Sequence, residues 1–326
     1  MAEFLNPLRQ KLEKHGPHLF RAFATFFGYI VWQTALKYFL LTLVTFFLLS
    51  EQPELQTINA AIAPYEFTSS ALWAVLFVAF FRKLYPWVTT IPGDLLNFES
   101  LKKAFVSHLT LGLVVAVLFT LNLLFAGAYR YLGFFLDLDE SASVALRFVS
   151  VIALFYSEEF LFRYKILGRL LEVFPAPYAV ILVSILYTLN KAVQFDIGWT
   201  QGATLFLLSV VVSLQYMARK DFLAGAGYII GLMLTFHVIL GMPIMGNEFS
   251  RVIMIQYQDP MPGSAFSNDW WSYLLFGGRS GPLSSILFQL LLVTQITFLA
   301  FGRTLKRIYR FSLKKSLLNF RPTKLK

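Results

Sequence analysis

Eight apolar runs, each close to the length that crosses a lipid bilayer, dominate this 326-residue chain. A helix needs about 20 apolar residues to cross the hydrocarbon core, and helical conformation satisfies its backbone polar groups there. Only 14% of the residues are charged, whereas a soluble domain carries about 25%. The sequence therefore predicts an all-α, multi-pass bundle of about eight transmembrane helices. The runs lie at residues 28–50, 69–86, 104–127, 142–165, 177–195, 201–218, 222–242 and 284–302.

The distribution of Lys and Arg indicates how these spans are oriented. Cytoplasmic loops of membrane proteins carry an excess of basic residues. With the N-terminus inside, 22 of the 28 Lys and Arg fall on the cytoplasmic side and 4 on the outside. Both termini are therefore predicted to be cytoplasmic, with a basic amphipathic segment at 1–27 and a basic tail at 303–326. Nucleic-acid binding is not expected, because basic and aromatic residues do not interleave on one face.

The segment at 243–283, between the last two runs, lies outside in this topology. It contains AFSNDWWSYLLFGG, and paired tryptophans are typical of a segment in the membrane interface. The eight-span domain is thus predicted at 28–302. We expect an integral protein of a bacterial plasma membrane, with the lipid bilayer around it.

Two adjacent carboxylates lie inside the fourth apolar run, in VIALFYSEEFLFRYKILGRL. One carboxylate within a span costs roughly 3 kcal/mol on insertion scales, so Glu158 and Glu159 need compensation. Arg163 follows Glu159 by one turn, in the favourable orientation for an i,i+4 pair. Two adjacent carboxylates at low dielectric resist ionising together, which favours a role in proton transfer. Alternatively, the pair only holds neighbouring helices together.

Other polar residues are expected at the depth of the glutamates. Counting about 1.5 Å per residue from the cytoplasmic ends places Glu158, Lys191 and His237 at a depth of about 15–22 Å. Lys191 either joins the glutamates or extends toward the outer surface. Asn190 faces about 100° away around the helix, so only one of these two neighbours is expected to reach the glutamates.

These residues resemble the signatures of the CAAX-protease and bacteriocin-processing (CPBP) family, which are EExxxR, FxxxH and HxxxN. The family consists of intramembrane proteases with eight helices, and the resemblance covers roughly residues 104–242. The run from Glu158 and Glu159 to Arg163 matches the first signature completely.

The other two signatures match in part. In the second, Tyr187 takes the aromatic place and Lys191 the histidine place. In the third, His237 matches and Gly241 stands in the asparagine place. A glycine supplies no side-chain donor, and one lost oxyanion contact costs about 3 kcal/mol.

The resemblance implies hydrolysis of a peptide bond in a membrane-associated peptide or protein. Glu158 would activate water, His237 would stabilise the oxyanion, and Glu159 with Arg163 would support the site. Lys191 is the third catalytic candidate by its place, and Asn190 is the alternative for that place.

No cofactor is expected. A protonated lysine ligates a metal poorly, and His237 with two carboxylates would make a thin zinc site, so a divalent metal is disfavoured.

Two alternatives remain open at this point. A catalytically impaired relative could bind hydrophobic or lipidated peptides in the same cavity, as Lys191 and Gly241 suggest. A transporter or ion pathway would also hold buried charges, although the chain lacks the internal repeats typical of transporters. Because buried charges persist mainly in pairs, Lys191 is expected to pair with Glu158 or Glu159. His237 is expected to approach Glu158 within about 8 Å, close enough to share a water.

Overall fold

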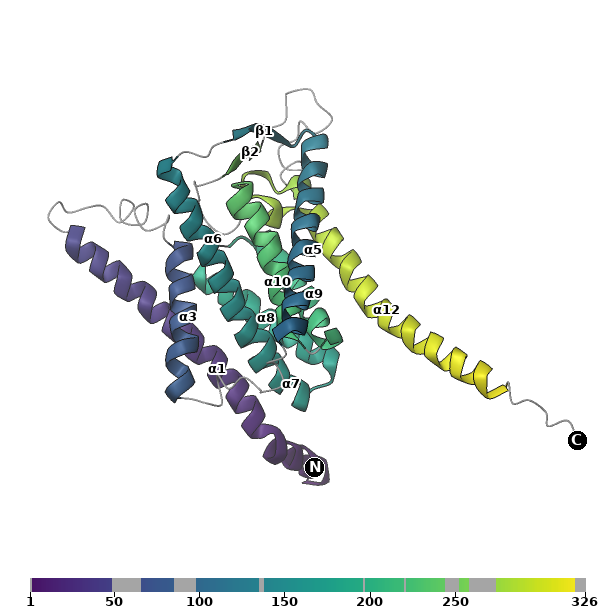
Figure 1. Ribbon diagram of the computed structural model, residues 1–326. Helices are drawn as coiled ribbons and strands as arrows, with labels where there is room; N and C mark the ends of the chain where they lie inside the picture. Colours follow the sequence, from purple (N-terminus) through teal and green to yellow (C-terminus); the bar gives the residue numbers. More distant parts are fainter. Residues whose placement is uncertain are drawn as a thin grey trace, which may run out of the picture.

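The computed structural model describes residues 2–48, 66–84, 98–134, 138–195, 197–219, 221–243, 252–257 and 274–319. Each apolar run of the sequence overlaps a helix, and most of the helices pack side by side (Figure 1). The long helices are α1 (Ala2–Leu48), α3 (Glu66–Leu84), α5 (Phe98–Phe125), α6 (Leu138–Glu159), α8 (Ala176–Gln194), α9 (Trp199–Arg219), α10 (Phe222–Met233) and α12 (Ile286–Asn319).

The helices have the composition of a membrane protein. Among the described residues, four helical segments are long and apolar enough to cross a bilayer, and two apolar helices are shorter. Figure 1 shows the N-terminal end of α1 and the C-terminal end of α12 on the same side of the bundle. The predicted helical membrane bundle is therefore confirmed, whereas the count of eight spans and the cytoplasmic placement of both termini stay predictions. The four longer segments are Lys102–Phe125, Ala176–Gln194, Trp199–Arg219 and Phe222–Ile239.

Helix α10 lies at the centre of the bundle and approaches α5 closely. A Cβ atom at Gly227 would overlap the carbonyl oxygen of Phe105, and one at Gly231 would overlap that of Leu109. From the other side, a Cβ atom at Gly112 would overlap the carbonyl oxygen of Tyr228. Small residues allow such approach in membrane bundles, where van der Waals packing drives helix association. These glycines therefore allow α10 to pack closely against α5. This contact sets the position of η5, which continues α10 and contains His237.

The structure departs from a purely helical fold at one end of the bundle. Strands β1 (Tyr129–Phe134) and β2 (Ile253–Tyr257) pair antiparallel, and Figure 1 places them above α5 and α6. Both are rich in aromatic and aliphatic residues, which favour strands, but they lie outside the long apolar runs from which the fold was predicted. The all-α bundle predicted from the sequence still describes the fold, with this short two-stranded sheet added at one end. The tryptophans of the predicted interfacial segment 243–283 lie outside the described residues.

Two helices widen into π-helix where the functional candidates lie. Helix α6 continues into η4 (Phe160–Leu167) directly after Glu159, and α7 (Gly168–Val173) follows. Helix α10 continues into η5 (Leu234–Ile239), which contains His237. Short π-helical turns inside α-helices are rare and occur frequently at functional sites. The backbone thus marks the same two places as the sequence signatures.

Candidate active site

The site is built around Glu158, which is fully buried in the last turn of α6. Lys191 Nζ lies 2.6 Å from Glu158 Oε2. Asn190 Nδ2 donates a hydrogen bond to Glu158 Oε1 at 3.2 Å. The expected pairing of Lys191 with one of the glutamates is therefore confirmed, and each carboxylate oxygen has a different partner on α8.

The expectation that only Asn190 or Lys191 could reach the glutamates was wrong. The angle of about 100° between adjacent residues describes where their side chains leave the helix. It does not limit the reach of lysine, whose flexible four-carbon stem can carry the ammonium back toward its neighbour's target. Because the carboxylate of Glu158 offers two oxygens, the short amide and the long amine contact it together.

The second glutamate is held separately. Arg163 Nε lies 3.2 Å from Glu159 Oε2, as the i,i+4 spacing predicted, and both side chains are fully buried. Arg163 Nη2 also donates to Ser209 Oγ at 3.0 Å, and Ser209 Oγ donates to Ser184 Oγ at 3.1 Å. This network joins η4 to α9 and α8. Its geometry suits the supporting role that the sequence indicated for Glu159 and Arg163.

Aromatic rings surround the buried ammonium of Lys191. Its Nζ lies 4.8 Å from the ring centroid of Phe155, 5.2 Å from that of Phe195 and 5.7 Å from that of Tyr187. The quadrupole of an aromatic ring attracts a cation, most strongly where water is excluded. The side chain of Lys191 therefore lies in the interior of the bundle and does not extend toward the outer surface.

A polar chain connects the ammonium to α1, and the sequence analysis missed it. Lys191 Nζ donates to Gln194 Oε1 at 3.1 Å, and Gln194 Nε2 donates to the hydroxyl of Tyr29 at 3.4 Å. Gln33 Nε2 donates to the same hydroxyl at 2.8 Å. The i,i+3 spacing of Lys191 and Gln194 was the available signal, together with the i,i+4 spacing of Tyr29 and Gln33.

The buried His237 belongs to an aromatic cluster that it shares with Lys191. The rings of His237 and Phe67 lie 5.0 Å apart. Phe67 also contacts Phe155 and Phe195, at 6.0 and 5.6 Å between ring centroids. These two rings flank the ammonium of Lys191. The cluster thus brings the third signature next to the first two, while the predicted approach of His237 to Glu158 within about 8 Å stays a prediction.

Gly241 lies just after η5 and takes a backbone conformation that few residues tolerate. Its φ angle is +57°, in the left-handed region that favours glycine and, among other residues, asparagine. The place where the family signature has asparagine therefore has a backbone that an asparagine could adopt. Here it supplies no side chain.

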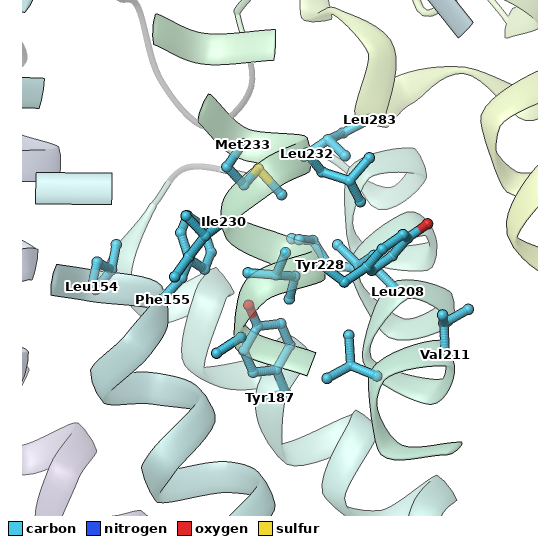
Figure 2. Packing of buried hydrophobic residues seen from close by; sticks show 14 of the residues in the cluster. Leu154, Phe155, Tyr187, Leu208, Val211, Tyr228, Ile230, Leu232, Met233 and Leu283 are labelled. Carbon is cyan, nitrogen blue, oxygen red and sulfur yellow. The ribbon is translucent and has the colours of Figure 1, made fainter. Parts of the chain in front are cut away.

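Tyr187 lies one turn before Lys191 on α8 and is fully buried. The guanidinium carbon of Arg163 lies 5.1 Å from the centroid of its ring. Figure 2 shows its side chain pointing into the bundle interior, with the hydroxyl on the side of Phe155. Among the described residues, this hydroxyl has no hydrogen-bond partner.

The donor set does not suit a divalent metal. No group of three or more His, Cys, Asp and Glu that could hold a metal occurs among the described residues. The oxygen of Glu158 that would ligate such an ion instead contacts an ammonium. A cation at that oxygen would have to displace Lys191 and overcome its repulsion.

Comparison with known families supports the resemblance seen in the signatures. Residues 140–230 match a family model described as Rce1-like, type II CAAX prenyl endopeptidase. This segment includes the first two signatures, with Glu158, Tyr187 and Lys191, and ends before His237. The CAAX-protease resemblance is thereby confirmed. No curated protein and no solved structure gave a significant match to the chain.

Proposed function

From the match to Rce1-like prenyl endopeptidases, we propose that the chain is an intramembrane endopeptidase of the CAAX-protease type, with Glu158 as its water-activating base. The observation that carries the proposal is the fully buried carboxylate of Glu158, which Asn190 and Lys191 hold by separate oxygens. A carboxylate fixed in a low-dielectric interior can orient a water molecule and accept its proton.

The proposed reaction needs one base and one oxyanion donor. Glu158 removes a proton from water as the water oxygen bonds to the scissile carbonyl carbon. The carbonyl oxygen becomes an oxyanion, for which His237 is the donor implied by the family resemblance. The C–N bond then breaks, and the proton held by Glu158 passes to the leaving amine. The substrate is a membrane-associated peptide or protein.

Lys191 sets how fast this reaction can run. Its ammonium lies 2.6 Å from Oε2 of Glu158 and holds the carboxylate in an ion pair, which competes with the binding of a water at that oxygen. Because Lys191 and Asn190 each occupy one oxygen of Glu158, a water can bind only at the acceptor positions that these contacts leave. We therefore expect slow hydrolysis.

The same contact favours a second candidate function. A protein that keeps the family's cavity, but holds its base in an ion pair and lacks a side chain at Gly241, could bind hydrophobic or lipidated peptides without cleaving them. Binding without turnover is the property that separates the two candidates.

The decisive experiment is cleavage of membrane peptides by the purified protein in liposomes. The peptides would include prenylated and unprenylated C-terminal sequences, with products identified by mass spectrometry. Wild type should cleave at least one peptide, and Glu158→Gln should lower that rate at least 100-fold. Glu172→Gln, at a half-exposed carboxylate on α7, is the matched control and should cleave as wild type does. Peptide binding without cleavage would establish the second candidate instead.

A further inference from the structure

The hydroxyl of Tyr187 is buried, and no hydrogen bond among the described residues compensates for its loss of water. Its atom is inaccessible to solvent and has no hydrogen-bond partner among the described residues. A buried donor without a partner costs free energy, so native structures retain few of them, and each calls for an explanation. A phenylalanine would fill the same space without this cost. The hydroxyl therefore points to a partner that comes from outside the chain.

The position of Tyr187 places that partner at the site of Glu158. Tyr187, Asn190 and Lys191 lie on one face of α8 at i, i+3 and i+4 spacing, and the latter two contact Glu158. The charges of Glu158 and Glu159 both act on the hydroxyl of Tyr187. In Figure 2 this hydroxyl lies on the side of Phe155, whose ring contacts the ammonium of Lys191.

The surroundings of the ring suit a group that donates to negative charge. The guanidinium of Arg163 lies 5.1 Å from the ring centroid, and the ammonium of Lys191 lies 5.7 Å from it. The two cations favour negative charge that develops near the ring, whereas the carboxylates of Glu158 and Glu159 act against it at the hydroxyl. A pre-oriented donor in a site without water stabilises a developing oxyanion far better than the same donor does in water.

We propose that Tyr187 is a further catalytic residue, whose hydroxyl donates a hydrogen bond to the oxyanion of the tetrahedral intermediate. This inference rests on the proposed peptidase function. When water adds to the carbonyl carbon and Glu158 takes its proton, the carbonyl electron pair moves to oxygen. Tyr187 donates to that oxygen without transferring its proton. The hydroxyl thereby supplies the donor that the glycine at position 241 lacks.

The test compares the kinetics of Tyr187→Phe with its stability. Removing one oxyanion donor lowers kcat about 100-fold or more, with little change in KM. Because the lost hydroxyl has no partner among the residues that the structure describes, the melting temperature should stay the same or rise. Tyr228→Phe is the matched control, since its buried hydroxyl donates to Gln295 Oε1 at 2.7 Å. That variant should melt earlier and keep its kcat.

A second variant tests the role without relying on one loss of activity. Gly241→Asn in the Tyr187→Phe background places an amide donor where the family signature has one. Asparagine tolerates the φ angle of +57° at this position, so the double variant should fold and recover at least part of the lost kcat.

The outcomes separate this inference from the proposed function. If Glu158→Gln abolishes cleavage and Tyr187→Phe cleaves as wild type does, the role of Tyr187 is overturned and the peptidase stands. A parallel loss of kcat and melting temperature in Tyr187→Phe would also overturn it, because the hydroxyl would then be structural. If wild type and Glu158→Gln cleave equally, or neither cleaves, the proposed function falls and this inference falls with it.

Discussion

The ammonium of Lys191 and the carboxylate of Glu158 form a 2.6 Å ion pair between α8 and α6, with both side chains fully buried. Taking two charges out of water costs several kcal/mol per ion, and their attraction offsets this cost only with additional hydrogen bonds. Asn190 and Gln194 supply those bonds, one to each member of the pair. The pair is thus the centre of a four-residue polar unit that holds two helices together.

Removing one member of this pair should destabilise the protein strongly. Glu158→Ala leaves the ammonium of Lys191 without its counter-charge, so we expect a loss of about 3–5 kcal/mol in the free energy of unfolding. The double variant Glu158→Ala/Lys191→Met removes both charges and should recover part of that loss. The free energies of unfolding of wild type, the two single variants and the double variant are measured in mixed detergent micelles. This double-mutant cycle gives the interaction energy of the pair. Additive effects of the two single variants would show that the pair contributes no interaction energy.

Substitutions of Gln194 should shift cleavage in opposite directions. Its side-chain oxygen accepts a hydrogen bond from Lys191, and its side-chain nitrogen donates to the hydroxyl of Tyr29. Gln194→Glu offers the ammonium a second carboxylate that competes with Glu158, so Glu158 is more often free to bind a water and cleavage should rise several-fold. Gln194→Leu leaves Glu158 as the ammonium's carboxylate partner, and cleavage should fall or stay the same.

The control for this pair of variants is Gln201→Leu. Gln201 is a buried glutamine in the first turn of α9, and its side-chain nitrogen donates to the carbonyl oxygen of Ser280. Its substitution should leave the cleavage rate unchanged. Equal changes in rate for Gln194→Glu and Gln194→Leu would contradict the proposed competition for Lys191.

The ion pairs of the site could be predicted from the sequence because an unpaired charge inside a membrane span costs so much free energy. An acid or a lysine within an apolar run is so unfavourable that it demands a partner, and few partners were available to Glu158, Glu159 and Lys191. The Arg163 pair followed from helical spacing alone. The free-energy cost of buried charges and the helical spacing of the residues together therefore predicted which charged side chains form pairs.

Other parts of the site and fold carried no comparable signal. Gln194 and Tyr29 look ordinary near the ends of apolar runs, where polar and aromatic residues are common. The runs are apolar on most sides, so the sequence does not indicate how each helix is rotated about its axis. The aromatic rings around the ammonium of Lys191 could therefore not be predicted. Strands β1 and β2 lie outside the runs and depend on pairing between segments far apart in sequence.

The close approach of α5 and α10 should make glycine substitutions there severe. A Cβ atom at Gly231 would overlap the backbone carbonyl of Leu109, which cannot move aside as a side chain could. Gly231→Ala should therefore lower the melting temperature by several degrees and displace η5 with His237. Gly28→Ala, where no atom lies within 4 Å of the added Cβ, is the control. It should be neutral or stabilising, because alanine favours a helix over glycine by about 1 kcal/mol.

The topology follows from the distribution of basic residues and can be tested directly. Reporter fusions after Lys83 and after Arg219 should report a cytoplasmic position, and a fusion near Asp137 should report an external one. Glycosylation or phosphatase reporters distinguish the two sides. An external reading at either basic segment, or a cytoplasmic one near Asp137, would refute the eight-span arrangement.

Restoring the family pattern should raise the rate of peptide cleavage. Lys191→His replaces the ammonium beside Glu158 by a group that can be neutral at physiological pH, so the carboxylate is no longer held in an ion pair. Gly241→Asn adds a donor for the oxyanion on a backbone that already has the required left-handed φ angle. The first change acts on the transfer of a proton from water to Glu158, and the second acts on the oxyanion of the intermediate. The double variant should therefore cleave a membrane peptide at least tenfold faster than wild type, as measured by the initial rate in liposomes.

The comparison needs a variant that removes the same charge without supplying an imidazole. Lys191→Met keeps the length of the side chain and should raise the rate less than Lys191→His does. Adding Glu158→Gln to the restored protein should abolish the gain, because every step of the proposed mechanism passes through that carboxylate. If the restored protein folds normally and cleaves no faster than wild type, Lys191 does not restrain Glu158.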